Sequence, residues 1–135
     1  MGNGIIHHVG APVHDMPAGI EAYRQLFGYA LPSGPFDDPI QKVSVCFVGS
    51  ETPGEFAIEL VSPAGDASPS NRALAKDNTA YHICYEVGNI KRTLDDVRAK
   101  GCVIVSGPVP TVAFGGRRIA WFYTPTRQLI EVLER

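Results

Sequence analysis

The hydrophobic residues of this chain follow one order of patterns and then repeat it. Apolar residues alternate with other residues over positions 5–13 and again over 81–87, which predicts a strand in each place. Each strand is followed by apolar residues at helical spacing, over 15–28 and 89–101. Both helices are followed by further predicted strands, which are VSVCFVG and EFAIELV in the first half and CVIVSG, RRIAWFYT and QLIEVLE in the second.

The ends of the two predicted helices carry suitable residues. Asp15 and Asn89 can cap the first turns, and Gly28 and Gly101 follow the last turns. The apolar stripes predicted for the two helices are Ile20, Tyr23, Leu26 and Phe27, then Ile90, Leu94 and Val97.

The repeated order predicts an α+β fold of two βαβββ modules. We place the modules at residues 4–64 and 79–134, with the linker at 65–78. The linker is rich in Pro, Ser, Ala and Asn and has room for one short helix. Because 135 residues is about the size of one ordinary domain, we expect both modules to form a single domain.

Four polar residues occupy matching places in the two modules. The bulky residues of 81–87 take the odd positions, so His82 is expected on the face that the helix does not cover. Glu59 and Glu131 each stand between large apolar residues and are expected on the same uncovered face. His8 corresponds to His82 in the first strand. The four side chains converge if the two sheets face each other.

Two imidazoles and two carboxylates are suited to a divalent metal ion. Their nitrogen and oxygen donors favour Zn, Ni, Co, Mn or Fe(II) over Ca, and they leave coordination positions for substrate or water. Any one His or Glu on a strand face is commonly a solvated residue, but the repetition favours a ligand set.

Charge and composition exclude several other functions. The net charge of -2 and the lack of a Lys/Arg run give no basic surface for nucleic acid or an anionic membrane. No apolar run reaches about 18 residues, and MGNGIIHH is unlike a signal peptide, so we expect a cytoplasmic protein. Three cysteines without a CxxC pair predict neither a disulfide framework nor a zinc knuckle.

The sequence blocks resemble those of the vicinal oxygen chelate superfamily, which includes glyoxalases, bleomycin-resistance proteins and dioxygenases. The similar blocks are HHVGAPVHDMPAGIEAYRQLFGY, FAIELVSP, YHICYEVGNIKRTLDDVRAKG, GGRRIAWFYTP and LIEVLE, which cover nearly the whole chain. The resemblance implies sheets that form a cup around one metal ion. It also implies that the metal ligands are His8, Glu59, His82 and Glu131.

Within that superfamily, the blocks look most similar to those of methylmalonyl-CoA epimerases. This implies an enzyme that binds a small substrate through a metal-chelating carbonyl or carboxylate and moves the adjacent proton. Glu131 is the first candidate for the catalytic carboxylate and Glu59 the second.

One feature differs from these epimerases, which carry an acidic residue on the strand before the first ligand carboxylate. The matching place here holds Ile40 or Gln41, neither of which is a carboxylate base. Either Asp37 or Asp38 takes over, or the reaction differs. We predict that Gln41 contacts substrate, although DDPIQ is equally typical of a polar loop.

Arg117 and the Trp121 strand leave further alternatives open. Arg117 follows a Gly-Gly turn and could bind an anionic substrate, or it could belong to a solvated Arg pair. Trp121 and Tyr123 share one strand face, but the sequence does not determine which face points away from the helix.

Other members of the superfamily supply the alternative functions. A lactoylglutathione lyase-like enzyme would share the ligand set, but FGYALPSG lacks the expected glutathione-binding arginine. A ring-cleaving dioxygenase fits the extra Glu59 poorly, and a non-catalytic binding protein usually lacks the ligands. Because VSVCFVG and RRIAWFYT leave sheet edges, we expect a homodimer that binds a small molecule.

Overall fold

The computed structural model describes residues 4–29, 33–49, 57–76, 78 and 80–135. The chain divides into two compact units. We call His8–Tyr81 the N-terminal unit, and we call His82–Arg135 with the residues up to His7 the C-terminal unit. Strand β1 begins in the C-terminal unit and continues into the N-terminal one.

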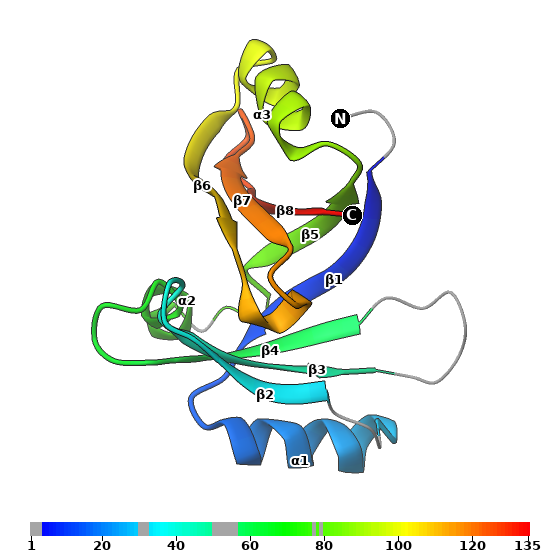
Figure 1. Cartoon of the computed structure of the whole chain (residues 1–135). Helices are drawn as coiled ribbons and strands as arrows, with labels where there is room; N and C mark the ends of the chain where they lie inside the picture. The colour runs from blue at the N-terminus through cyan, green and yellow to red at the C-terminus, as the bar shows by residue number, and fades with distance from the viewer. Residues whose placement is uncertain (1–3, 30–32, 50–56, 77, 79) are drawn as a thin grey trace. The chain divides into compact units, whose positions relative to one another are not determined.

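The N-terminal unit has the strand order β2-β3-β4-β1. Strand β1 pairs with β4 in parallel, while β2 with β3 and β3 with β4 pair antiparallel. Helix α1 runs along this sheet (Figure 1), and α2 follows β4 in the predicted linker. The elements are β1 Ile5–Pro12, α1 Met16–Phe27, β2 Ser33–Asp38, β3 Val43–Val48, β4 Ala57–Pro63 and α2 Ser70–Ala75.

The C-terminal unit repeats this topology with the strand order β6-β7-β8-β5. Strand β5 pairs with β8 in parallel, and the other neighbours pair antiparallel. The predicted α+β fold with two βαβββ modules is therefore confirmed. The elements are β5 His82–Val87, α3 Ile90–Ala99, β6 Val103–Pro110, a 3-10 turn Val112–Phe114, β7 Arg118–Tyr123 and β8 Leu129–Glu134.

The predicted helix caps are present. Asp15 Oδ2 accepts a hydrogen bond from the Ala18 backbone N–H at 3.0 Å, and Asn89 Oδ1 accepts one from Arg92 at 3.0 Å. Gly28 follows α1 with a φ of 71°, a conformation that glycine adopts without steric cost. Short polar side chains thus satisfy N–H groups that have no partner within either helix.

Each helix covers the predicted apolar face of its sheet. In the C-terminal unit, Ile90, Leu94 and Val97 pack with residues of all four strands. In the N-terminal unit, Ile20 and Tyr23 pack beside a smaller core. The buried residues of that core are Ala11, Met16, Cys46, Val48 and Leu60.

The stripe predicted for α1 is wrong at its last two residues. Leu26 is 74% exposed and Phe27 is 59% exposed. Leu26 lies six residues after Ile20, well short of two turns, so it points away from the sheet. Phe27, the last helical residue, contacts the rings of Tyr23 and Tyr29 at centroid distances of 5.3 and 5.8 Å.

Strand β2 was not predicted from the sequence. Its residues, SGPFDD, have no apolar alternation, and most of them are exposed. The strand lies at the end of its sheet and pairs only with β3 among the described strands. The segment is a strand because it pairs with β3, and the local sequence pattern does not predict that pairing.

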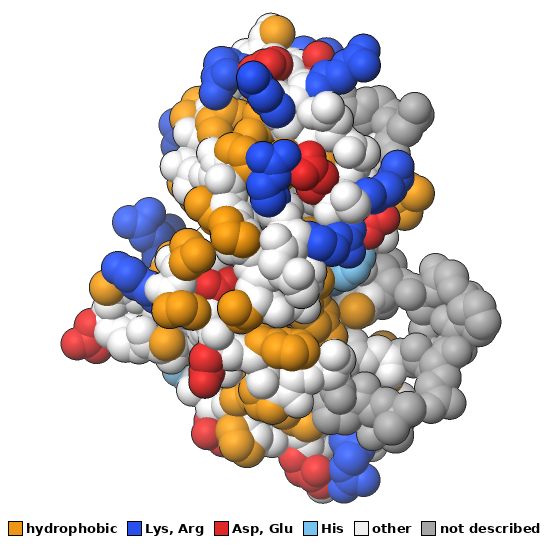
Figure 2. Space-filling model, viewed as in Figure 1, with side chains coloured by type: hydrophobic (Ala, Val, Ile, Leu, Met, Phe, Trp, Pro, Cys, Tyr) orange, Lys and Arg blue, Asp and Glu red, His pale blue; other side chains and the backbone are white. Residues whose placement is uncertain are grey.

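Hydrophobic side chains also reach the surface over the upper part of the view in Figure 2. In strand β6, Val103 and Val105 are both exposed. None of the described helices is long and apolar enough to cross a membrane.

Candidate functional site

The C-terminal unit holds a buried His–Glu pair. His82 begins β5 and Glu131 lies in the neighbouring strand β8, on the sheet face away from α3. His82 Nε2 lies 3.1 Å from Glu131 Oε2, and both side chains are buried. A buried, charged carboxylate costs free energy unless it is paired with another group or binds a metal ion. The burial of Glu131 therefore indicates such a partner.

The N-terminal unit holds a second buried pair with the same construction. His8 Nε2 in β1 lies 3.6 Å from Glu59 Oε1 in β4, and both residues are buried. Glu59 pairs in register with Gly10, two residues after His8. Glu131 pairs in register with Cys84, two residues after His82.

An aromatic residue completes each pair at an equivalent place. Phe47 is the cross-strand neighbour of Glu59, and its ring meets the His8 ring at 5.4 Å and 71°. Trp121 is the cross-strand neighbour of Glu131, and its ring meets the His82 ring at 4.7 Å and 79°. Edge contacts of this kind restrict the orientation of each imidazole. The repeat therefore extends from the fold to three side chains in each unit.

The structure also determines the face on which Trp121 lies. Ala120 and Phe122 pack into the core with α3, so Trp121 lies on the opposite face with Glu131. Sequence reasoning left this choice open because large side chains point from both faces of β7. The buried neighbours Ala120 and Phe122 are the signal that distinguishes the faces.

Gln41 lies far from the Glu59 carboxylate. It occupies the turn between β2 and β3, where its backbone N–H donates to Asp38 Oδ1 at 3.0 Å. Strand β3 begins at Val43, and Phe47, the neighbour of Glu59, is about 13 Å further along the strand. Asp38 thus stabilises the turn, and substrate contact by Gln41 stays a prediction.

Arg117 is held within the C-terminal unit. Its Nη2 donates to Glu86 Oε2 at 2.9 Å, and its Nε donates to the Glu134 carbonyl at 2.8 Å. The Arg117 guanidinium, with Arg135 and His7 as smaller influences, lowers the pKa of Glu86. Contact with an anionic substrate stays a prediction for this arginine.

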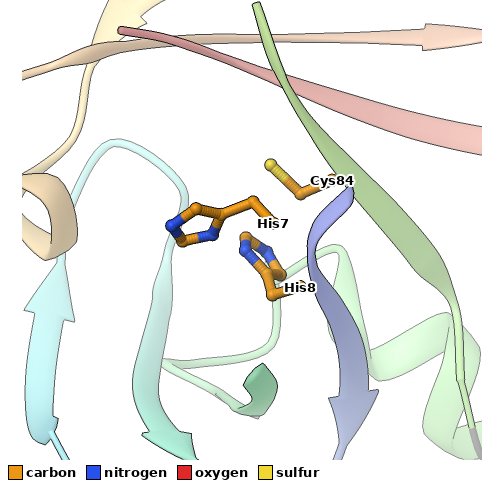
Figure 3. Close-up of side chains that lie close together, drawn as sticks. All are labelled: His7, His8 and Cys84. Carbon is orange, nitrogen blue, oxygen red and sulfur yellow. The ribbon is translucent and has the colours of Figure 1, made fainter. Parts of the chain in front are cut away.

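His7 and Cys84 form another contact in the C-terminal unit. Their donor atoms lie within 4.8 Å of each other (Figure 3). The His7 ring also meets the Phe114 ring edge-on at 5.2 Å. Cys84 is buried and is not part of a disulfide among the described residues. The pair was not predicted, because alternation within two separate strands does not show that they approach each other.

The fold and the two His–Glu pairs define a class of protein, and family comparison agrees. The profile of the Glyoxalase/Bleomycin resistance protein/Dioxygenase superfamily matches residues 7–121. The chain belongs to this superfamily, as the sequence blocks predicted.

Epimerases are among the proteins similar in sequence to this chain. An ethylmalonyl-CoA/methylmalonyl-CoA epimerase of Cereibacter sphaeroides is 30% identical over 122 residues, which cover 89% of this chain and 88% of that protein. The mitochondrial methylmalonyl-CoA epimerase of Mus musculus is 33% identical over 99 residues. That match covers 72% of this chain and 53% of the mouse protein.

Solved structures share the fold at lower identity. The methylmalonyl-CoA epimerase from Mycobacterium tuberculosis has a TM-score of 0.82 and 22% identity, covering 96% of this chain and 86% of that chain. A methylmalonyl-CoA epimerase in complex with methylmalonyl-CoA and NH4+ has a TM-score of 0.77 and 23% identity. That match covers 97% of this chain and 94% of the other.

Proposed function

We propose that the chain is a metal-dependent epimerase that acts on the α-carbon of a small acyl thioester of the 2-alkylmalonyl class. The observation that carries the proposal is the buried His–Glu pair that occurs once in each unit. The names of the curated relatives support the reaction and the substrate class.

The donor set fits a divalent metal ion. Each unit supplies one imidazole and one carboxylate, and two donors are too few to hold an ion tightly. We therefore propose one ion held by all four residues, His8, Glu59, His82 and Glu131. Mixed nitrogen and oxygen donors favour Zn, Ni, Co, Mn or Fe(II). Such an ion would polarise a substrate oxygen and make the neighbouring C–H more acidic.

The two glutamates would carry the proton. Epimerisation removes the α-proton on one side of the carbon and returns a proton on the other side. An ionised carboxylate can accept the first proton, and we assign this step to Glu131. A second group that already carries a proton must then donate it to the opposite side of the carbon, and we assign this step to Glu59 in its protonated form. Glu131 would release its proton to solvent and Glu59 would take one from solvent before the next turnover. The burial of both pairs would keep water away from the reacting carbon.

A lyase acting on a glutathione adduct and a non-catalytic binding protein are the alternatives. The lyase would use the same fold and ligands and the binding protein the same fold, but neither would exchange the α-proton of a 2-alkylmalonyl thioester. We also propose that the protein works as a homodimer and that its only partner in catalysis is a small molecule.

Deuterium incorporation tests the proposal directly. Methylmalonyl-CoA is incubated in D2O with the protein loaded in turn with Zn, Ni, Co, Mn or Fe(II), and the α-deuterium is measured by mass spectrometry. We expect exchange well above the rate without protein, and a loss of about a hundredfold or more in Glu131→Gln. The exposed residue His14 provides the control variant His14→Ala, which should keep the wild-type rate. Exchange no faster than in buffer with every metal would contradict the proposed activity.

A further inference from the structure

We propose that Trp121 is a substrate-binding residue whose indole N–H donates a hydrogen bond to an oxygen of the bound ligand. The inference rests on the proposed function, because it places the ligand at the His82–Glu131 pair. It adds a residue that the repeat alone does not explain, since the equivalent Phe47 has no polar atom.

The position of Trp121 is the first argument. Trp121 lies directly across from Glu131 in the β7–β8 ladder, on the same face of the sheet. Side chains opposite each other in an antiparallel pair have Cβ atoms about 5 Å apart. The indole also meets the His82 ring edge-on at 4.7 Å. Any ligand bound to both His82 and Glu131 therefore lies within reach of this ring.

The hydrogen-bonding state of the indole is the second argument. Trp121 Nε1 is buried and has no hydrogen-bond partner among the residues that the structure describes. A buried donor without a partner costs about 1–3 kcal/mol, which is why tryptophan N–H groups in protein interiors are usually paired. A ligand oxygen at the His82–Glu131 pair would supply the acceptor that the protein lacks.

The surroundings of the ring fit this role. Trp121 packs against an apolar group made of Cys84, Ile119 and Leu133, all of which are buried. This packing holds one side of the indole against largely apolar side chains. The ring as a whole is only half-buried, so a rotation about its Cβ–Cγ bond can turn the N–H toward a bound oxygen.

Malonate is a suitable probe, because its two carboxylates resemble the oxygens of a malonyl group and it undergoes no epimerisation. The chain has one tryptophan, so the 15N-labelled, Zn²⁺-loaded protein has a single indole N–H resonance. We expect malonate to move this resonance downfield and to slow its exchange with solvent. An indole resonance that stays unchanged when malonate saturates the protein would overturn the inference.

The variant Trp121→Phe tests the donor while keeping an aromatic ring against His82. We expect it to bind Zn²⁺ like the wild type and to bind malonate about tenfold to a hundredfold more weakly, the range for a hydrogen bond to a charged group. The control is Tyr85→Phe, which removes a polar group from the helix-covered face of the same sheet and should leave malonate affinity unchanged. Equal malonate affinity in Trp121→Phe and wild type would also overturn the inference.

These outcomes separate the inference from the proposed function. Wild-type deuterium exchange together with undiminished malonate binding in Trp121→Phe would refute the role of Trp121 and leave the epimerase intact. If Trp121→Phe binds malonate more weakly and the wild type shows no deuterium exchange, the role of Trp121 is supported and the epimerase is refuted. A Zn²⁺-loaded wild-type protein that binds no malonate would refute the role of Trp121, and deuterium exchange with the five metals would still decide the epimerase.

Discussion

Glu134, near the end of β8, caps the start of helix α3. Its Oε2 accepts a hydrogen bond from the Ile90 backbone N–H at 2.8 Å, and Arg118 Nε donates to Oε1 at 3.0 Å. The Ile90 N–H, with Arg118 as a smaller influence, lowers the pKa of Glu134. The last strand of the chain and the helix that covers its sheet are thus joined through one carboxylate.

Loss of the Glu134 charge should destabilise the C-terminal unit. The substitution Glu134→Gln keeps the shape of the side chain but removes its charge, and it leaves only one oxygen to accept from Ile90 and Arg118. We expect the free energy of unfolding to fall by about 1 kcal/mol, as measured by urea denaturation. Asp95→Asn is a suitable control, since Asp95 is 64% exposed in its pair with Arg98. It should change stability by less than about 0.5 kcal/mol. Equal losses in the two variants would argue against the cap.

Stability should also depend on pH through Glu86 and Glu134. The folded protein lowers the pKa of both groups from the ordinary value of 4.5. The unfolded chain therefore takes up these protons at higher pH than the folded one. The stability that the groups contribute is complete above 4.5 and is lost as pH falls through their folded values. Denaturation from pH 6 to 3 should show a shallower decline in the double variant Glu86→Gln/Glu134→Gln than in the wild type. Parallel curves would mean that these pairs do not stabilise the fold.

The proposed metal site predicts one ion per chain. We expect His82→Ala and Glu131→Ala to lose the ion during dialysis against a weak chelator. Loss of a residue that only orients a metal ligand weakens metal binding by roughly tenfold to hundredfold. Removal of a direct ligand should weaken metal binding by at least as much. The His8→Ala and Glu59→Ala variants should lose it equally, because all four residues would hold the same ion. Metal content is measured by mass spectrometry of the dialysed protein, with circular dichroism to confirm folding.

Two other results would change this assignment. Two ions per chain would indicate that each His–Glu pair binds its own metal. Full metal occupancy in folded His82→Ala would show that this residue is not a ligand. The exposed His14 again supplies a control, since His14→Ala should retain the wild-type metal content.

Homodimer formation can be tested at strand β6. The sheet edges predicted at VSVCFVG and RRIAWFYT are wrong, because β3 and β7 each lie between two other strands. Strand β6 ends the order of the C-terminal sheet instead and exposes Val103 and Val105. Exposed apolar edges of this kind favour pairing with a second chain. Light scattering at micromolar concentration should give twice the chain mass of 14.6 kDa, and Val105→Lys should shift the protein toward monomer if β6 forms the interface. A strictly monomeric wild type would contradict the prediction.

Much of the site could be inferred from alternation alone. In β5, the period of two assigns Ile83, Tyr85 and Val87 to the core, and the structure agrees. The same reasoning assigned His82 and Glu131 to the opposite face. These inferences succeeded because the pattern within a single strand fixes which way a side chain points.

The residues that were missed depend on contacts between strands. Strand β2 is defined by its pairing with β3, and Cys84 meets His7 from a different strand. The face of Trp121 was undetermined because large side chains, Trp121 and Phe122, point from opposite faces of β7. Pairing and register are set by tertiary packing, which the local pattern does not encode.

The glycine at position 107 supplies the last prediction. Gly107 in β6 has a φ of +91°, and a Cβ there would lie 2.6 Å from the Ile119 carbonyl oxygen and 2.7 Å from the Ala120 Cα. Gly115, in contrast, has a φ of +63° and open space around it. Alanine at 115 carries only the cost of a left-handed backbone, about 1 kcal/mol, whereas alanine at 107 adds a clash with the backbone of β7.

We therefore expect Gly107→Ala to lower the free energy of unfolding by about 3 kcal/mol or more, and Gly115→Ala to lower it by about 1 kcal/mol. Urea denaturation of the two variants measures the difference. Gly107→Ala should also bind Zn²⁺ more weakly. The clash displaces Ala120 in β7, and the next residue of that strand, Trp121, pairs with Glu131 of β8. Similar free energies of unfolding for the two variants would contradict the prediction. They would show that β6 and β7 can separate near Gly107 at little energetic cost.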